Sequence, residues 1–398
     1  MADSVLYTIV GKEKGTGLTG GMKIVYIIFS ISKMTGIERM FVCQMNYLAE
    51  QFGYDMTLLT YDQGDAPDAY PLSPKVSHID FNIKTFHIYR YPLPIRPFIK
   101  MKWNRKLGDL IRNTISHIAP DIVVCSSYEI SEMRIVLSLQ NVKRVVQIHS
   151  SYLQSGGRLR SRHIESGIRL LYNRLFVFHR VVRLVRQFDS IVALTHGDAK
   201  LWRSPRVTVI PNALAIETVS KQCERKKKVI AVGSLLMVKG FDMLIEAWRK
   251  ICVNHPDWLL EITGEGVEEP HLLQQIESLP SVRILPKTAD IGSRYQSGEI
   301  FVLSSRYEGF GLVLLEAMSY GLACVSFDCD FGPREMITDG KDGYLVSLGD
   351  IDALAERIEY LMNHENDRRR IGENAVIKAS QYRIDKIMSL WKQHYESL

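Results

Sequence analysis

Two glutamates eight positions apart, Glu308 and Glu316, are the residues of this sequence best suited to chemistry on a ligand rich in hydroxyls. An ionised carboxylate only accepts hydrogen bonds, and it can take both protons of a vicinal diol. The loop that follows Glu308 contains Gly309 and Gly311, so its backbone N–H groups can approach a ligand closely. This combination indicates a ligand with a phosphate core and a sugar at each end, which is the description of a nucleotide-sugar.

The segments around this loop predict the elements that position it. The run 300–303 is short and apolar, as a buried strand is. The apolar run 312–318 continues to Tyr320, and Gly321 stands where the C-cap of a helix is expected. A second strand-like run covers 323–327. The order of strand, glycine loop, helix and strand predicts a parallel βαβ unit, in which ligands bind at the carboxyl ends of the strands and the helix start favours an anion.

Length and composition place the chain among globular proteins. Its 398 residues, 46% hydrophobic and 24% charged, suffice for two domains that each bury a core. No run approaches the roughly 18 apolar residues of a membrane-spanning helix, and no secretory signal pattern is present. The six cysteines lack the paired spacing of a zinc site, so we interpret them as reduced, buried thiols of a cytoplasmic protein.

The net charge of +6 conceals two halves of opposite sign. Residues 1–212 hold 28 Lys and Arg against 16 Asp and Glu, whereas the remainder holds 22 against 28. Two stretches, 84–112 and 158–186, each carry eight basic residues and one acid among apolar side chains. Either stretch alone is typical of a solvated helix face, but the pair favours contact with an anionic membrane surface. No nucleic-acid-binding motif accompanies the charge, so nucleic acid is not a predicted partner.

The sequence E-G-F-G-L-x-x-x-E-A-M-S-x-G at 308–321 resembles the signature of the retaining family 4 glycosyltransferases, which have the GT-B fold. The resemblance implies that Glu308 contacts hydroxyls of the donor sugar and that Glu316 binds the ribose of the nucleotide. It also implies that N–H groups near Gly311 and Leu312 receive the diphosphate. The continuation S-F-D-C-D-F-G-P-R-E-M-I at 326–337 resembles the branch of the family that builds capsular and exopolysaccharides.

A second stretch, V-G-S-L-L-M-V-K-G-F at 232–241, resembles the other signature of this family. Lys239 stands where a cation would neutralise the departing diphosphate. The family has an arginine five residues before this lysine, and here that position is Ser234. Either Arg306 or Arg334 substitutes for the missing charge, or catalysis is weak.

The first half of the chain supplies fewer specific signals. Thr35 and Gly36 follow the first predicted strand and are similar to a family turn that faces the interdomain cleft, although an ordinary βα turn fits equally well. His149 follows the predicted strand 145–148, where the family has a histidine that contacts the donor sugar. The tripeptide Ile210-Pro-Asn212 resembles the family sequence that ends the first domain, with Ala213 in place of a glycine.

These signals predict an α/β protein of the GT-B class, with two Rossmann-like, doubly wound parallel-sheet domains and a cleft between them. Residues 1–21 form an irregular lead-in, 22–215 an acceptor-binding domain, 216–380 a domain that binds the nucleotide-sugar, and 381–398 a helix that crosses back to the first domain. The lead-in contains GTGLTG, a literal G-x-G-x-x-G. A strand-like segment follows it, rather than the helix that a dinucleotide-binding loop opens, which excludes a Rossmann dehydrogenase.

The resemblance implies a metal-independent enzyme without cofactor, which transfers a hexose or N-acetylhexosamine to a lipid-linked saccharide. The expected donor is a UDP-sugar, in preference to GDP-mannose. The expected process is the biosynthesis of a polysaccharide, a capsule or lipopolysaccharide. The enzyme is expected in the cytoplasm, peripheral on the membrane. Its implied catalytic residues are Glu308, Lys239 and His149, and its implied donor-binding residues are Glu316, Gly309, Phe310, Gly311, Leu312, Val313, Gly233, Ser234, Thr35 and Gly36. Two alternatives share the fold: a catalytically silent nucleotide-sugar-binding subunit, which Ser234 favours, and a nucleotide-sugar epimerase.

Overall fold

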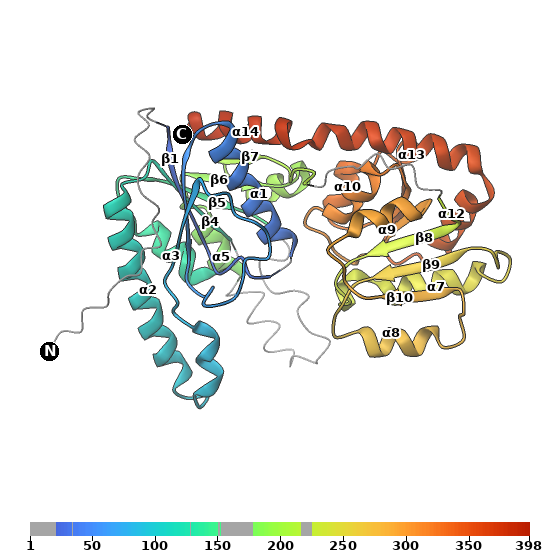
Figure 1. The fold of residues 1–398 in the computed structure, drawn as a ribbon, viewed down its shortest axis with the longest axis horizontal. Coiled ribbons are helices and arrows are strands. Elements are labelled where there is room, and N and C mark those ends of the chain that lie inside the picture. Colours follow the sequence, from blue (N-terminus) through green and yellow to red (C-terminus); the bar gives the residue numbers. More distant parts are fainter. Residues whose placement is uncertain (1–20, 34, 128, 150–151, 153–177, 216–224) are drawn as a thin grey trace. The chain divides into compact units, whose positions relative to one another are not determined.

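The computed structural model describes residues 21–33, 35–127, 129–149, 152, 178–215 and 225–398. The chain divides into two compact units, which Figure 1 shows in ribbon form. The first unit comprises the described residues up to Ile148 with Val181–Val192 and Trp391–Leu398. The second comprises Ala193–Leu390 and the described residues among 149–180. The expected lead-in up to residue 20, most of the basic stretch 158–186 and the expected boundary near 216 lie outside the described residues.

Seven strands form the first sheet, in the order β3-β2-β1-β4-β5-β6-β7. Every pair from β3 to β6 is parallel. The central strands are almost fully buried, as expected for a parallel sheet that is covered on both faces. The strands are β1 (Lys23–Ile28), β2 (Asp55–Thr60), β3 (Val76–Asp80), β4 (Ile122–Ser126), β5 (Lys143–Gln147), β6 (Ser190–Ala193) and β7 (Val207–Val209).

Helices lie in the connections between these strands, except between β2 and β3, where residues 61–75 form a loop. The longest is α2 (Arg96–Ile118), which runs beside the sheet in Figure 1 and follows the short 3-10 helix η1 (Thr85–Arg90). The others are α1 (Gly36–Gln51), α3 (Ile130–Leu137), α5 (Phe178–Val185) and α6 (His196–Trp202).

The second sheet has six parallel strands in the order β10-β9-β8-β11-β12-β13. The chain reverses its direction of winding between β8 and β11, and ligands bind at such switch points in open α/β sheets. The strands are β8 (Lys228–Val232), β9 (Leu259–Thr263), β10 (Val282–Leu285), β11 (Ile300–Leu303), β12 (Ala323–Asp328) and β13 (Tyr344–Ser347).

The two faces of this sheet bury separate apolar cores. Val302 of β11 packs with α7 and α12 on one face, whereas its neighbours Phe301 and Leu303 pack with α9 and α10 on the other. This alternation follows from the two-residue period of a strand. The helices are η3 (Met237–Lys239), α7 (Phe241–Ile251), α8 (Glu269–Ile276), α9 (Ile291–Ser297), α10 (Leu312–Ser319), α11 (Gly332–Met336), α12 (Ile351–Asn363), α13 (Glu365–Ala379), η4 (Ser380–Tyr382) and α14 (Ile384–Glu396).

The last of these helices, α14, contributes its final turns to the first unit, since Trp391–Leu398 cluster there. The Tyr395 hydroxyl lies 2.6 Å from the Tyr26 hydroxyl of β1, and both side chains are fully buried or nearly so. Gln44 of α1 donates a hydrogen bond to the same Tyr395 oxygen at 3.3 Å. These contacts tie α14 to the centre of the first sheet.

The predicted α/β class with two doubly wound parallel-sheet units is confirmed. Sequence reading found the buried strands and missed β3, whose polar residues alternate with apolar ones at a sheet edge. Helix α1 begins at Gly36, directly after Thr35. Among the helices that the structure describes, none combines the length and the hydropathy that crossing a bilayer requires.

Candidate active site

The turn after β8 carries the lysine that the sequence singles out. The 3-10 helix η3 ends at Lys239, and Gly240 follows with a φ of +64° before α7 begins. Glycine adopts this left-handed conformation without strain. A Cβ atom at Gly240 would lie 2.0 Å from the backbone oxygen of Ser304, so only glycine lets this turn pack against the segment after β11.

Lys239 and Glu308 meet at the switch point of the second sheet, since one follows β8 and the other follows β11. The Lys239 Nζ atom lies 2.6 Å from the Glu308 Oε1 atom, and the two side chains are 23% and 10% exposed. The Ser305 hydroxyl donates to the same oxygen at 2.7 Å. The structure therefore pairs two of the predicted catalytic residues, and the partial exposure of Lys239 keeps its ammonium within reach of a ligand.

Arg306 fixes the turn that carries Lys239. Its guanidinium forms a two-pronged ion pair with Asp242, with both N–O distances 2.7 Å, and also donates to the Met237 carbonyl oxygen at 2.7 Å. This pairing raises the pKa of Arg306 and lowers the pKa of Asp242. A planar guanidinium suits such bidentate contacts. Arg306 thus braces η3, and its charge is already opposed by a carboxylate.

Glu316 is buried within α10, with 3% of its surface exposed. The Tyr295 hydroxyl of α9 donates to its Oε2 atom at 2.9 Å. Tyr295 is itself fully buried and packs edge-on against Phe301 at a ring-centroid distance of 6.0 Å. The orientation of the Glu316 carboxylate is therefore set by the core of the second unit.

The start of α10 provides the anion-favouring end that the sequence predicts. Gly311 is the N-cap residue, with a φ of +93°, and Leu312 opens the helix. The first N–H groups of a helix, here those of Leu312 and Val313, have no partner within the helix. Their partial positive charge favours a phosphate. Phe310 is buried in the core beneath this turn, whereas Gly309 is partly exposed.

The loop after β12 packs against the same region. Glu308 and Phe331 form an isolated parallel bridge, and a Cβ atom at Gly332 would lie 2.3 Å from the Phe310 oxygen. Phe331 has a φ of +65°, a strained conformation for a bulky residue, and such strain persists where surrounding structure enforces it. Burial, and to a smaller extent the nearby Glu308 carboxylate, raises the pKa of the Cys329 thiol. This loop therefore forms a third wall beside Lys239 and Glu308.

Of the other predicted residues, Gly233 lies beside Lys239, since a Cβ atom there would be 3.5 Å from the Lys239 side chain. Ser234 is exposed and Gly233 is partly exposed after β8. Arg334 is exposed and pairs with Asp328, with its Nε atom 2.8 Å from Oδ1. Thr35 is the N-cap residue of α1, which Gly36 opens, and its carbonyl accepts the Tyr70 hydroxyl at 3.3 Å.

His149 follows β5, as predicted. His149 is partly exposed as a whole, but the Nε2 atom of its ring is buried. Burial lowers the pKa of His149 to about 4. The imidazole is therefore neutral at physiological pH.

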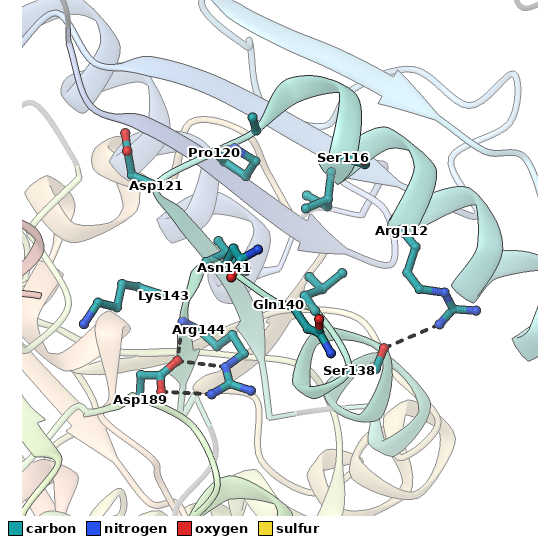
Figure 2. A pocket seen from close by; sticks show the side chains of 14 residues that line it. Arg112, Ser116, Pro120, Asp121, Ser138, Gln140, Asn141, Lys143, Arg144 and Asp189 are labelled. Atoms are coloured by element: carbon teal, nitrogen blue, oxygen red, sulfur yellow. Dashed lines mark hydrogen bonds and ion pairs between the residues drawn. The ribbon is translucent and has the colours of Figure 1, made fainter.

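A groove of about 1120 Å³ in the first unit holds none of these residues (Figure 2). Asp121, Lys143 and Asp189 line it just before or at the starts of β4, β5 and β6. Figure 2 shows Arg144 bridging to Asp189 along one wall, where its Nε atom lies 2.8 Å from the carboxylate. The groove is thus at the amino edge of the sheet, opposite the edge at which ligands bind in this class of fold.

Comparison with known proteins decides the family. Two family models match consecutive parts of the chain: Glycosyltransferase Family 4 matches residues 34–218, and Glycosyl transferases group 1 matches residues 215–377. This chain belongs to the family 4 glycosyltransferases. The expected GT-B fold is confirmed along with the family.

Individual relatives agree over nearly the whole length of the glycosyltransferase. An uncharacterized glycosyltransferase of Haemophilus influenzae is 27% identical over 379 residues, 93% of this chain and 99% of the relative. The amylovoran biosynthesis glycosyltransferase AmsD of Erwinia amylovora is 24% identical over 389 residues, 93% of this chain and 98% of AmsD. The solved structure of HepE from Anabaena in complex with UDP and glucose has a similar fold, with a TM-score of 0.70, 18% identity, and coverage of 95% of this chain and 100% of HepE.

Sequence reading missed three residues that hold the candidate site of this glycosyltransferase in place: Ser305, Asp242 and Tyr295. Ser305 lies three residues before Glu308, and Asp242 lies three residues after Lys239, but serine and aspartate at such positions are common in loops and helix starts. Tyr295 lies 21 residues before Glu316, and no local pattern links the two. Only tertiary structure identifies these supports.

Proposed function

We propose that this glycosyltransferase transfers a hexose or N-acetylhexosamine from a nucleotide-diphosphate sugar, with UDP-sugars preferred, to a hydroxyl group of a lipid-linked saccharide in the biosynthesis of a cell-surface polysaccharide. The observation that carries the proposal is the 2.6 Å pair of Lys239 and Glu308 at the switch point of the second sheet, beside the start of α10. The similarity to AmsD, a glycosyltransferase of amylovoran biosynthesis, supports the class of product. The similarity to HepE, which was solved with UDP, supports the nucleotide.

In the proposed reaction, the bond between the anomeric carbon and the diphosphate oxygen breaks, and a bond from the acceptor oxygen forms on the same face. The proton of the acceptor hydroxyl passes to an oxygen of the departing phosphate. Lys239 and the N–H groups at the start of α10 stabilise the negative charge that develops on the diphosphate. Glu308 and His149 hold the sugar hydroxyls, and Glu316 accepts from the ribose, so that the donor keeps one orientation throughout.

We expect the charge stabilisation to need no metal ion or cofactor, because Lys239 supplies a cation and its partner Glu308 lies three residues before the start of α10 at Gly311. Lys239 exchanges its ion pair with Glu308 for the diphosphate, which frees the carboxylate for the sugar. Gly233 and Ser234 leave space on the β8 side, and Gly309 with Phe310 shapes the other side. On the first unit, Thr35 and Gly36 line the edge of the sheet where the acceptor is expected.

Turnover of purified protein tests this proposal. Release of the nucleotide from UDP-, GDP- and ADP-sugars, measured with and without EDTA and with a short lipid-linked saccharide, should be fastest with a UDP-sugar and insensitive to EDTA. Proton NMR of the product should show the anomeric configuration of the donor. Product of the opposite configuration would contradict retention, and activity lost with EDTA would contradict metal independence.

Lys239→Ala should lower kcat by roughly 100- to 1000-fold, the range found when one group that stabilises developing charge is removed. Lys250→Ala is the matched control, because Lys250 is an exposed lysine of the next helix whose partner is Asp352. Equal activity of the Lys239 and Lys250 variants would show that Lys239 does not take part in transfer.

A catalytically silent nucleotide-sugar-binding subunit is the second candidate. One observation favours it: Ser234 replaces the arginine of the family signature, while Arg306 and Arg334 are each engaged by a carboxylate. Donor binding in a thermal-shift screen, without nucleotide release for any sugar or acceptor, would select this candidate over the enzyme.

A further inference from the structure

The surface from Lys84 to Lys106 exposes an unusual number of large apolar side chains. Of the seventeen such exposed side chains among the described residues, six lie between Tyr89 and Met101. Tyr89, Leu93 and Phe98 are 77%, 73% and 68% exposed. Scattered exposed apolar residues are ordinary, but a cluster marks an interaction surface. We refer to residues 84–106, which comprise η1 and the first half of α2, as the tip.

The tip is held in shape by its own contacts. The Arg96 guanidinium donates to the Tyr91 carbonyl oxygen at 2.9 Å and lies over the Tyr89 ring, 5.5 Å from its centroid. Tyr91 packs edge-on against Trp103 at 6.2 Å. The exposed apolar residues therefore project from an ordered element, so a partner would find them already in position.

The charge of the tip has one sign. It contains no Asp or Glu, and it carries seven basic residues, of which all except Arg96 are exposed: Lys84, Arg90, Arg96, Lys100, Lys102, Arg105 and Lys106. Leu93 and Ile95 lie just before α2, and Phe98 and Met101 lie in its first turns. Basic residues precede these apolar residues, lie among them and continue along the helix from Lys102. Exposed apolar side chains surrounded by basic ones suit the boundary between the acyl chains and the headgroups of a bilayer.

The tip also lies at the functional edge of the first sheet. Ile83 donates its N–H to the Tyr61 oxygen at 2.7 Å, just beyond the carboxyl end of β2, and η1 begins two residues later. At the other end of α2, Asp121 accepts the N–H of Lys23 at 2.7 Å, at the amino end of β1. Helix α2 thus runs from the carboxyl edge of the first sheet to its amino edge. The apolar first turns of α2 lie at the carboxyl edge, the edge at which Thr35 and Gly36 come after β1.

We propose that the tip docks this glycosyltransferase on a bilayer that contains anionic phospholipids, with Leu93, Phe98 and Met101 inserted among the headgroups and the basic residues of α2 against the phosphates. The inference deepens the proposed function, because it names the surface that brings the acceptor edge of the first unit to a membrane-embedded substrate. A second copy of the chain is a poorer occupant, since two such tips would bring fourteen like charges together.

Vesicle sedimentation of the full chain tests the docking surface. Wild-type protein should bind mixed vesicles of phosphatidylcholine and phosphatidylglycerol, and binding should fall as NaCl is raised from about 0.05 to 0.5 M, because salt screens exposed charges. Two triple variants should each bind more than tenfold more weakly than wild type: Leu93→Ser/Phe98→Ser/Met101→Ser and Lys100→Gln/Lys102→Gln/Arg105→Gln. The first loses apolar area that would be buried among the headgroups. The second loses three basic residues, each of which contributes about fivefold near the surface.

Val376→Ser/Ile377→Ser is the matched control, because these apolar residues of α13 are 42% and 65% exposed and lie outside the tip. It should bind as wild type does. An unchanged thermal midpoint shows that the tip variants remain folded. Both tip variants should also hydrolyse the nucleotide-sugar donor, with water as the acceptor, at the wild-type rate. A failure of docking is then separable from a failure of the proposed transfer.

Three results would overturn the proposal. They are wild-type binding by both tip variants, equal binding to vesicles of phosphatidylcholine alone, or a wild-type dimer that the Leu93→Ser/Phe98→Ser/Met101→Ser variant dissociates. Absence of glycosyl transfer with intact vesicle binding would leave the docking surface standing and refute the proposed function instead.

Discussion

At the scale of single residues, the candidate site depends on side chains that the fold holds before any ligand is present. Lys239 and Glu308 satisfy each other at 2.6 Å, and Tyr295 orients Glu316. Each pair joins a residue that the sequence singles out to a neighbour from another strand or helix. Preorganisation of this kind lowers the cost of ordering charged groups during the reaction.

A buried carboxyl in the first unit, Glu132, should make the stability of the fold depend on pH. Burial raises the pKa of Glu132 from 4.5 to about 8, although its hydrogen bonds from Tyr61 at 3.0 Å and from the Ser126 N–H at 3.2 Å partly oppose the shift. A group whose pKa is raised in the folded state stabilises it below the unfolded pKa, and this stabilisation is lost as pH rises through the folded pKa. At 1.36 kcal/mol per pKa unit, the loss between pH 4.5 and pH 8 is of order 4 kcal/mol.

Glu132→Gln should therefore flatten the decline in stability across this pH window, because the amide cannot ionise. Hydrogen exchange of the β4 amides, measured from pH 5 to pH 8 with correction for intrinsic rates, reports the local free energy of opening. Asp109→Asn, a change at an exposed carboxylate paired with Arg112, should leave the pH dependence as it is. An identical decline in wild type and Glu132→Gln would rule out Glu132 as its source.

At the scale of elements, two loops at a strand switch point require close approach of backbone. Gly240→Ala would place a methyl group 2.0 Å from the Ser304 oxygen and so displace the turn that carries Lys239. We expect a loss of kcat of at least tenfold, together with a lower thermal midpoint. Gly340→Ala is the control for backbone strain without a steric clash. Gly340 has a φ of +73°, but a Cβ atom there would meet no other atom within 4 Å. It should lose only about 1 kcal/mol of stability, with activity intact.

The sequence could predict the strands and the glycine loops because each is written in local residue patterns. Short apolar runs predicted β11 and β12, and Gly311 lies in the glycine loop predicted after β11. The supports of the site could not be found this way. The partners Arg306 and Asp242 lie 64 residues apart, and their pairing depends on the order in which the strands are placed in the sheet.

At the scale of the whole molecule, the last turns of helix α14 are part of the first unit's interior. The Tyr395 hydroxyl bonds to that of Tyr26, and Gln147 bonds to Gln44 beside them at 3.1 Å. Tyr395→Phe should leave the buried Tyr26 hydroxyl with Gln147 alone and deprive the Gln44 amide of its acceptor, a loss that costs about 1 to 3 kcal/mol. Hydrogen exchange of the β1 amides should quicken accordingly.

Tyr26→Phe/Tyr395→Phe should recover part of that loss, because replacing both partners removes the unsatisfied hydroxyl. A double variant that is destabilised by the full sum of the two single changes would contradict a coupled pair.

The position of Tyr395 has a consequence for how the protein is made. The first sheet begins at Lys23, yet the Tyr26 hydroxyl of its central strand finds its 2.6 Å partner in the last turns of α14. Tyr395 is synthesised 369 residues after Tyr26, when the residues of the second unit have already been synthesised. A domain near the start of a chain usually folds during translation. Here the N-terminal sheet must wait, incomplete, until the last turns of α14 emerge.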